Sequence, residues 1–318
     1  MPTLSLVTFI SGDEIIAEEF LVLADFLRLN FTDLDVRAFT NRQEIVCDPL
    51  KQTVSCGTTK YARIQQLLVE TRASYCLCID NDITPNQHEV LAFLQEAFAS
   101  QADLSWGRIG VVPRRGIVAN MIKIDKIISH HVIRPTLWKL GLGASLPGQL
   151  FLIKSESFYG KLLAPNTVFD DLAIGICAKQ YNCRTHYSTK TLGLEKPKIT
   201  LTSLLAQRIR WARGFAQILI INWHTPKNRL LVLVHGISYH LLWLPIWGLI
   251  FAVIIVNVKL ALLLWVLISL ALTFGHMSLV LPALFYSIIF PAVHLTWLAS
   301  MLYFVITMPQ KYKLSSAD

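Results

Sequence analysis

Short apolar runs alternate with longer amphipathic stretches over the first 80 residues. Runs at 4–10, 35–40 and 75–79 have the length of strands. Between them, 14–29 and 58–72 repeat apolar residues at three- and four-residue steps, which predicts helices. Strands and helices that alternate at this spacing indicate an α/β fold with a parallel sheet covered by helices on both faces.

The pattern is less regular between residues 103 and 200. A glycine-rich segment at 141–148 precedes an apolar run at 149–153, which predicts a strand. A helix is expected at 171–180, whereas 183–200 has the composition of a loop.

The stretch 201–223 has the period of a helix, with one apolar stripe formed by Leu205, Ile209, Ala212, Ala216, Leu219 and Trp223. Gln207, Arg210 and Trp211 are spaced so that they are neighbours one turn apart. Arginine can bind a phosphate bidentately and tryptophan offers a flat surface to a sugar ring, so these side chains suit a substrate site. The alternative is a basic amphipathic helix lying on a membrane, with the arginines at 208, 210 and 213 toward lipid headgroups.

From residue 230 to 308 the chain carries almost no charge apart from Lys259. A membrane-spanning helix needs about 20 apolar residues. The stretch therefore predicts about three spans, near 231–256, 260–280 and 284–306.

Charges beside these predicted spans indicate their orientation. Lys227 and Arg229 flank the first span and are expected in the cytosol. Three spans would leave Lys311 and Lys313 on the opposite side and an even number would return them, so the number stays open. Four histidines are expected to have separate interfacial or helix-contact roles: His235, His240, His276 and His294.

The composition agrees with a chain that is partly embedded in lipid. Of its 318 residues, 53% are hydrophobic and only 16% are charged, with a net charge of +8. Soluble domains are closer to a quarter charged. No long basic run or aromatic RNA-binding motif accompanies the positive charge, so no nucleic-acid partner is expected. The domains expected are a cytosolic domain at 1–200, an interface helix at 201–228 and a transmembrane region at 229–318.

Acidic residues follow the third predicted strand directly, as Asp80, Asn81 and Asp82. Ligands of α/β sheets bind beyond the carboxyl ends of the strands. Two carboxylates one residue apart suit Mg²⁺ or Mn²⁺ carried by a diphosphate, because these hard cations take oxygen ligands. The alternative is a turn or a helix cap, since Pro85 and Asn86 follow.

A second acidic pair, Asp170 and Asp171, opens the helix predicted at 171–180. A carboxylate held there could take the proton from an attacking hydroxyl. The alternative is an N-cap with a neighbouring acid that complements the helix dipole. Gly148 and the glycines before it would let the backbone approach a bulky ligand, or they form a turn before the strand.

The order of these features resembles the membrane-integrated family-2 glycosyltransferases, which include cellulose, chitin and hyaluronan synthases and ceramide glucosyltransferase. Their signature is D-x-D, then a T-E-D-type pair, then Q-x-x-R-W, on a Rossmann-like GT-A fold followed by transmembrane helices. Here these motifs are DND at 80–82, DD at 170–171 and QRIRW at 207–211. Gly57 and Lys60 are similar to the family's G-x-x-K segment, and EKP at 195–197 to the segment before Q-x-x-R-W.

The resemblance implies a role for each matching residue. Asp80 would contact the nucleoside or its phosphates and share with Asp82 the binding of Mg²⁺ or Mn²⁺. Asp171 would be the general base. The other substrate-binding residues would be Lys60, Gly148, Asp170, Gln207, Arg210 and Trp211. The sequence here is Phe169-Asp170-Asp171, where the family has Thr-Glu-Asp. Asp170 thus replaces the glutamate of the motif, which leaves its role open.

The leading hypothesis is therefore an integral membrane, inverting glycosyltransferase with a cytosolic catalytic domain, in a bacterial inner membrane or an ER- or Golgi-type membrane. It would move a sugar from a nucleotide-diphosphate sugar, expected to be a UDP-sugar, to a lipid or lipid-linked acceptor. A processive polysaccharide synthase is the second hypothesis, although few spans would make a narrow channel for a polymer. The third is a non-catalytic membrane scaffold that binds nucleotide sugars.

Overall fold

The computed structural model describes residues 2–308 apart from 11–13, 41–50, 55–58 and 163–166. Contacts divide the chain into two compact units. The sheet unit comprises Met1–Gly110 and Ala144–Lys196, and the helical unit comprises Val111–Gly143 and Pro197–Asp318. The helical unit thus takes a segment from the middle of the chain as well as its end.

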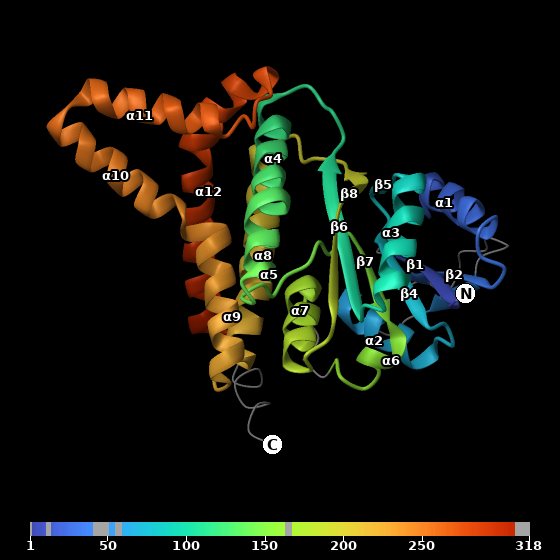
Figure 1. The fold of residues 1–318 in the computed structure, drawn as a ribbon. Coiled ribbons are helices and arrows are strands. Elements are labelled where there is room, and N and C mark those ends of the chain that lie inside the picture. The colour runs from blue at the N-terminus through green and yellow to red at the C-terminus, as the bar shows by residue number, and fades with distance from the viewer. Residues whose placement is uncertain (1, 11–13, 41–50, 55–58, 163–166, 309–318) are drawn as a thin grey trace. The chain divides into compact units, whose positions relative to one another are not determined.

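One sheet of eight strands, in the order β3-β2-β1-β4-β7-β6-β8-β5, runs through the sheet unit (Figure 1). Its strands are β1 (Leu4–Phe9), β2 (Leu34–Thr40), β3 (Lys51–Val54), β4 (Tyr75–Asp80), β5 (Ile83–Pro85), β6 (Leu104–Val111), β7 (Leu150–Lys154) and β8 (Thr185–Glu195). The pairs among β1, β2, β3 and β4 are parallel. The pairs β4–β7, β6–β7 and β5–β8 are antiparallel.

The expected parallel sheet is therefore correct for the first half of the unit and wrong for the second. Parallel neighbours need a crossover connection, which the N-terminal helices supply, whereas antiparallel neighbours do not. The strands predicted at 4–10, 35–40, 75–79 and 149–153 are confirmed, with ends that differ by one or two residues. The loop expected at 183–200 is wrong, because β8 occupies most of it. Most side chains of β8 are exposed or half-buried, so it lacks the apolar pattern of a core strand.

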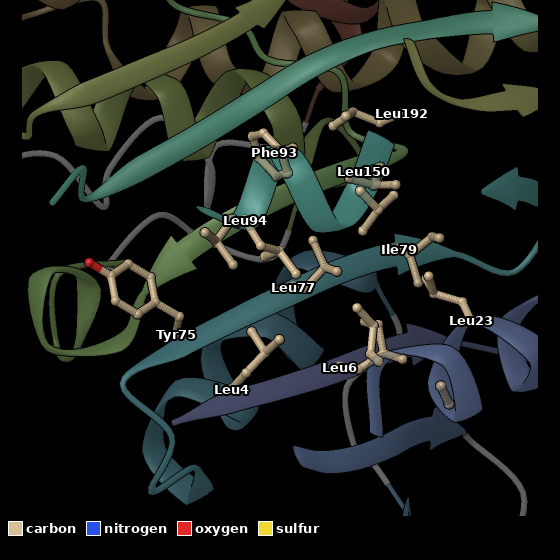
Figure 2. Packing of buried hydrophobic residues seen from close by; sticks show 14 of the residues in the cluster. Leu4, Leu6, Leu23, Tyr75, Leu77, Ile79, Phe93, Leu94, Leu150 and Leu192 are labelled. Carbon is tan, nitrogen blue, oxygen red and sulfur yellow. The ribbon is translucent and has the colours of Figure 1, made fainter. Parts of the chain in front are cut away.

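Helices α1 (Glu18–Arg28) and α3 (Gln87–Ser100) pack on one face of this sheet. Figure 2 shows the core between them, where Leu6, Leu77 and Leu150 come from three neighbouring strands. Leu23 of α1 and Phe93 of α3 complete it. Because successive strand residues point to opposite faces, Phe9, Cys78, Asp80 and Phe151 belong to the other face.

Three further helices complete the sheet unit: α2 (Lys60–Glu70), α6 (Ser155–Phe158) and α7 (Asp170–Gln180). The Thr59 side chain caps α2 by accepting from the backbone N–H of Ala62. Asn86 caps α3 in the same way through the N–H of Glu89. The expected helices at 14–29, 58–72 and 171–180 are confirmed, the first of them beginning later, at Glu18.

The helical unit contains α4 (Ile117–Ile127), the π-helix η1 (Ile128–Ile133), α5 (Arg134–Lys139), α8 (Leu201–Ile221), α9 (Pro226–Gly236), the π-helix η2 (Ile237–Leu241), α10 (Trp243–Val256), α11 (Val258–Ala271), the 3-10 turn η3 (Met277–Leu279) and α12 (Val280–Thr307). Its core joins α4, α8 and α12 through Met121, Leu204, Tyr286 and Phe290. Helices α10 and α11 form a hairpin with many exposed apolar side chains (Figure 1).

The apolar helices differ from the three predicted spans. Among the described residues, Met277–Thr307 is the one helix that is long and apolar enough to cross a membrane by itself. Pro226–Leu241 and Trp243–Val256 would make a second span if this pair, bent by 44°, is counted as one. The span expected at 260–280 is replaced by the 14-residue α11, which ends before a turn with positive φ at Phe274 and Gly275.

Candidate active site

The first acidic motif lies at the carboxyl end of β4, in the position expected for a ligand site. The backbone N–H of Asp80 donates to the carbonyl of Gln149 at 2.8 Å, and Asp82 is exposed. The side chain of Asn81 accepts from the N–H of Ala17 at 2.8 Å and donates to the carbonyl of Ile15 at 2.7 Å. Asn81 therefore ties the segment before α1 to the end of β4, a role that its position between two aspartates did not reveal.

Lys60 connects the two acidic motifs. Its Nζ donates to Oδ1 of Asp80 at 2.6 Å and to the carbonyl of Gly148 at 2.5 Å, and it lies 3.4 Å from Oδ2 of Asp170. The ammonium also lies 5.5 and 5.4 Å from the ring centroids of Phe9 and Phe151. Both rings share the sheet face of Asp80, so Lys60 reaches the carboxylates across an aromatic surface.

Burial and neighbouring charges set the protonation of this pair. Burial raises the pKa of Asp80 to about 6, and Asp170 and Asp82 add to that rise while Lys60 opposes it. Burial lowers the pKa of Lys60, but Asp80 and Asp170 outweigh it and hold that pKa above its ordinary value. At neutral pH the lysine is charged and Asp80 is ionised, yet Asp80 takes up a proton more readily than an exposed aspartate.

The second acidic pair lies in the first turn of α7. The N-cap of this helix is Phe169, so the alternative that one of the aspartates is the N-cap is wrong. Oδ1 of Asp171 accepts from the N–H of Leu172 at 2.8 Å. A Cβ on Gly148 would lie 3.3 Å from Cβ of Asp171 and 3.7 Å from Oδ2 of Asp170, so the glycine permits this close approach.

The structure thus brings together five predicted site residues of the sheet unit: Lys60, Asp80, Gly148, Asp170 and Asp171. Among the residues that the structure describes, no group of three or more His, Cys, Asp or Glu could hold a metal ion by itself. Sequence reasoning missed Asn81 and also Gln149, whose amide donates to Glu195 of β8 at 3.0 Å.

The remaining predicted residues lie on α8 in the helical unit. Gln207 and Trp211 are half-buried and Arg210 is exposed. Arg208 is only 4% exposed, so the alternative in which it faces lipid headgroups is wrong for this residue. Its Nη2 lies 2.5 Å from Oδ2 of Asp125 on α4.

Two aromatic side chains complete this buried ion pair. The hydroxyl of Tyr286 donates to Oδ1 of Asp125 at 3.2 Å. The guanidinium of Arg208 lies 4.4 Å from the ring centroid of Trp211. The predicted site residue Trp211 therefore rests on a cation that α4 and α12 hold in place.

Comparison with known proteins identifies the class of enzyme and then its family. The chain is a glycosyltransferase: residues 75–308 match the model of glycosyl transferase family group 2. The match covers most of the chain, so the protein belongs to this family. No curated protein matches the sequence.

Solved structures of two enzymes are similar to this chain. The mannosyltransferase PcManGT from Pyrobaculum calidifontis, in complex with GDP-Man and Mn²⁺, is similar with a TM-score of 0.59 and 15% identity, over 95% of this chain and 87% of that one. Glucosyl-3-phosphoglycerate synthase from Mycobacterium tuberculosis, with Mn²⁺, UDP-glucose and phosphoglyceric acid, gives a TM-score of 0.48 and 14% identity, over 69% and 79% of the chains. The likeness to PcManGT, together with the mixed sheet, gives the sheet unit an α/β, GT-A-like fold.

Proposed function

We propose that this glycosyltransferase moves a sugar, with inversion, from a nucleotide-diphosphate sugar to a lipid or lipid-linked acceptor at a membrane surface. The observation that carries the proposal is the contact of Lys60 with Asp80, Gly148 and Asp170, which places Asp171 beside the end of β4. A base for the acceptor and charges for a diphosphate are thereby gathered at one end of the sheet.

The oxygen ligands at the end of β4 suit a divalent cation that is carried by the substrate. Asp80 and Asp82 offer carboxylate oxygens, and the described residues provide no larger cluster that could form an all-protein cage. Mg²⁺ and Mn²⁺ bind in this way, through one or two carboxylates together with substrate phosphates. When bound, the cation would neutralise charge on the diphosphate. UDP is the expected nucleotide. GDP is the alternative, since the structure of PcManGT contains GDP-Man.

The protein groups have distinct tasks in this mechanism. Asp171 takes the proton from the acceptor hydroxyl as it attacks the sugar carbon from the side opposite the leaving group. Its Oδ1 is fixed by the N–H of Leu172. The ammonium of Lys60 stabilises negative charge on the departing diphosphate. On α8, Gln207, Arg210 and Trp211 would bind substrate, as their match to the family's Q-x-x-R-W motif implies.

The helical unit supports a lipid acceptor. Large apolar side chains of α10 and α11 are exposed, among them Phe251 at 58%, Ile255 at 86% and Leu263 at 54%. Such a contiguous apolar surface fits a bilayer better than water. The sheet unit would then face the cytosol, on the side of Lys227 and Arg229, in a bacterial inner membrane or an ER- or Golgi-type membrane.

Release of nucleoside diphosphate by the purified protein in detergent tests the proposal. UDP- and GDP-sugars are offered one at a time with Mn²⁺ or Mg²⁺. We expect one donor to be turned over, Asp171→Asn to abolish release, and Asp25→Asn, at an exposed carboxylate on α1, to leave it unchanged.

Two other outcomes would contradict the proposal. If Asp171→Asn kept the rate of the unmodified enzyme, Asp171 would not be the base. A ladder of long chains on a sizing gel would replace single transfer by processive synthesis.

A further inference from the structure

Two arginines are buried in the helical unit, and only one has a carboxylate partner among the described residues. Arg208 pairs with Asp125, whereas Arg134 at the start of α5 is 7% exposed and has no carboxylate within ion-pair distance. The Nε and Nη1 atoms of Arg134 are buried without a hydrogen-bond acceptor. A buried guanidinium in this state destabilises the fold unless an anion pairs with it.

The helical unit contains little acid that could pair with this guanidinium. Its sequence contains fifteen lysines and arginines but only two acidic residues, Asp125 and Asp318. Asp318 lies outside the residues that the structure describes, and Asp125 is already engaged by Arg208 and Tyr286. Among the described residues of the unit, no carboxylate is therefore left to pair with Arg134.

One polar aromatic ring contacts the guanidinium, and a second stacks on the first. Its Cζ lies 5.8 Å from the ring centroid of Tyr239 on η2, and His235 of α9 stacks on that ring at 4.4 Å. His130 lies four residues before Arg134 and is 3% exposed. Phenol and imidazole groups can donate hydrogen bonds and carry no negative charge that would repel an anion. They therefore suit an anion-binding site.

A pair of histidines holds η2 in place. Nδ1 of His240 lies 3.1 Å from Nδ1 of His294 on α12, so one ring donates to the other. His240 also stacks on Trp297 at 3.8 Å. These contacts fix η2 against α12 and thereby position Tyr239 next to Arg134.

We propose that Arg134, with Tyr239 and His235, binds the phosphate of a lipid headgroup. A guanidinium fork matches phosphate oxygens bidentately. The exposed apolar surface of α10 and α11 in the same unit supplies the environment for an acyl or prenyl chain. The inference rests on the proposed function and deepens it, because it assigns a phosphate to the lipid that this unit receives.

Thermal unfolding of delipidated protein in dodecyl maltoside tests this, with no sugar donor present. The probes are monododecyl phosphate and inorganic phosphate. We expect monododecyl phosphate to raise the melting temperature of the unmodified protein by roughly 5–10 °C at a hundredfold excess over its dissociation constant. Inorganic phosphate should give a smaller rise, because it lacks the chain.

Variants separate binding from structure. Arg134→Met should lose the shift with monododecyl phosphate and should keep or raise the melting temperature of the ligand-free protein, since an unpaired buried charge is removed. Arg229→Met removes a positive charge that lies on Trp223 at the surface of the same unit, and should keep the shift. Arg134→Lys should keep part of it, because the charge remains without the fork.

Three results would overturn the proposal. Arg134→Met could lower the ligand-free melting temperature and keep the phosphate shift, which would make Arg134 a packing residue on Tyr239. Arg229→Met could lose the shift equally, which would make the binding nonspecific. Equal shifts with both probes would reject a lipid as the source of the phosphate. Failure of nucleoside diphosphate release would affect only the proposed function, since no donor enters this assay.

Discussion

The ion pair of Arg208 and Asp125 gives a quantitative prediction about the helical unit. Its side chains are 5% and 22% exposed and approach to 2.5 Å. Removing one partner of a fully buried pair costs about 3–5 kcal/mol. Because Asp125 keeps some contact with water, we expect Asp125→Leu and Arg208→Met each to cost about 2–3 kcal/mol, or roughly 4–12 °C in melting temperature.

The double variant distinguishes this reasoning from simple loss of packing. When both charges are replaced by apolar groups, no unpaired charge remains, so most of the lost stability should return. The hydroxyl of Tyr286 still loses its acceptor, which leaves a deficit of about 1 kcal/mol. Adding Tyr286→Phe should remove that deficit.

Thermal unfolding in one detergent at one protein concentration measures the unmodified protein, the two single variants, the double variant and the triple variant. The expected coupling between the two positions is about 3 kcal/mol or more. Additive losses, with the double variant melting lowest, would refute the idea that the unpaired charge causes the damage. The rescued double variant also lacks the cation 4.4 Å from Trp211, so its turnover should stay reduced although its stability returns.

Three further predictions concern the sheet unit. Gly148→Ala should lower kcat several-fold with little change in melting temperature, because its Cβ would lie 3.3 Å from Cβ of Asp171 and displace the base by tenths of an ångström. Calorimetry should show the dissociation constant for Mn²⁺ rising as pH falls through about 6, since a proton on Asp80 competes with the metal. Metal-free protein should lose stability as pH rises through that value, because the pKa of Asp80 is raised by folding, and Mn²⁺ should restore it. Asn81→Ala should raise the KM for the donor and cost about 1–3 kcal/mol, as it removes two hydrogen bonds to residues 15–17, and an unchanged KM would reject that link.

The local sequence pattern was sufficient to predict a strand and the site residues at its end where an apolar run is followed directly by charged residues. β4 shows this, since YCLCI followed by Asp80 predicts both the buried strand and the acids at its end. Helix α2 follows from its period, and Lys60 at its start reaches Asp80 because both lie at the same end of the sheet. β8 could not be predicted in this way, because mostly exposed or half-buried side chains leave no apolar alternation to detect.

Spacing on α8 predicted neighbours but not the direction they face. It correctly made Gln207, Arg210 and Trp211 one-turn neighbours, and it left open an alternative in which Arg208 faces lipid. The partner of Arg208 is 83 positions earlier in the chain, on α4. A helical period contains no information about which face another helix will cover, so a buried arginine and a lipid-facing one look alike in sequence.

The division of charge between the two units also depends on contacts between distant segments, so it could not be predicted from local sequence. The total of +8 conceals a sheet unit in which acids outnumber bases and a helical unit with fifteen bases and two acids. The boundary could not be placed from sequence, because residues 111–143, which carry Asp125 and Arg134, fall within the domain expected at 1–200. Once they are assigned to the helical unit, three of its four apolar-region histidines also come together, as His235, His240 and His294, from segments far apart in the chain. Among the described residues of this unit, Arg134 is the buried cation without a carboxylate, and this is why we propose that an anion from the surroundings binds there, which a membrane would supply as phosphate.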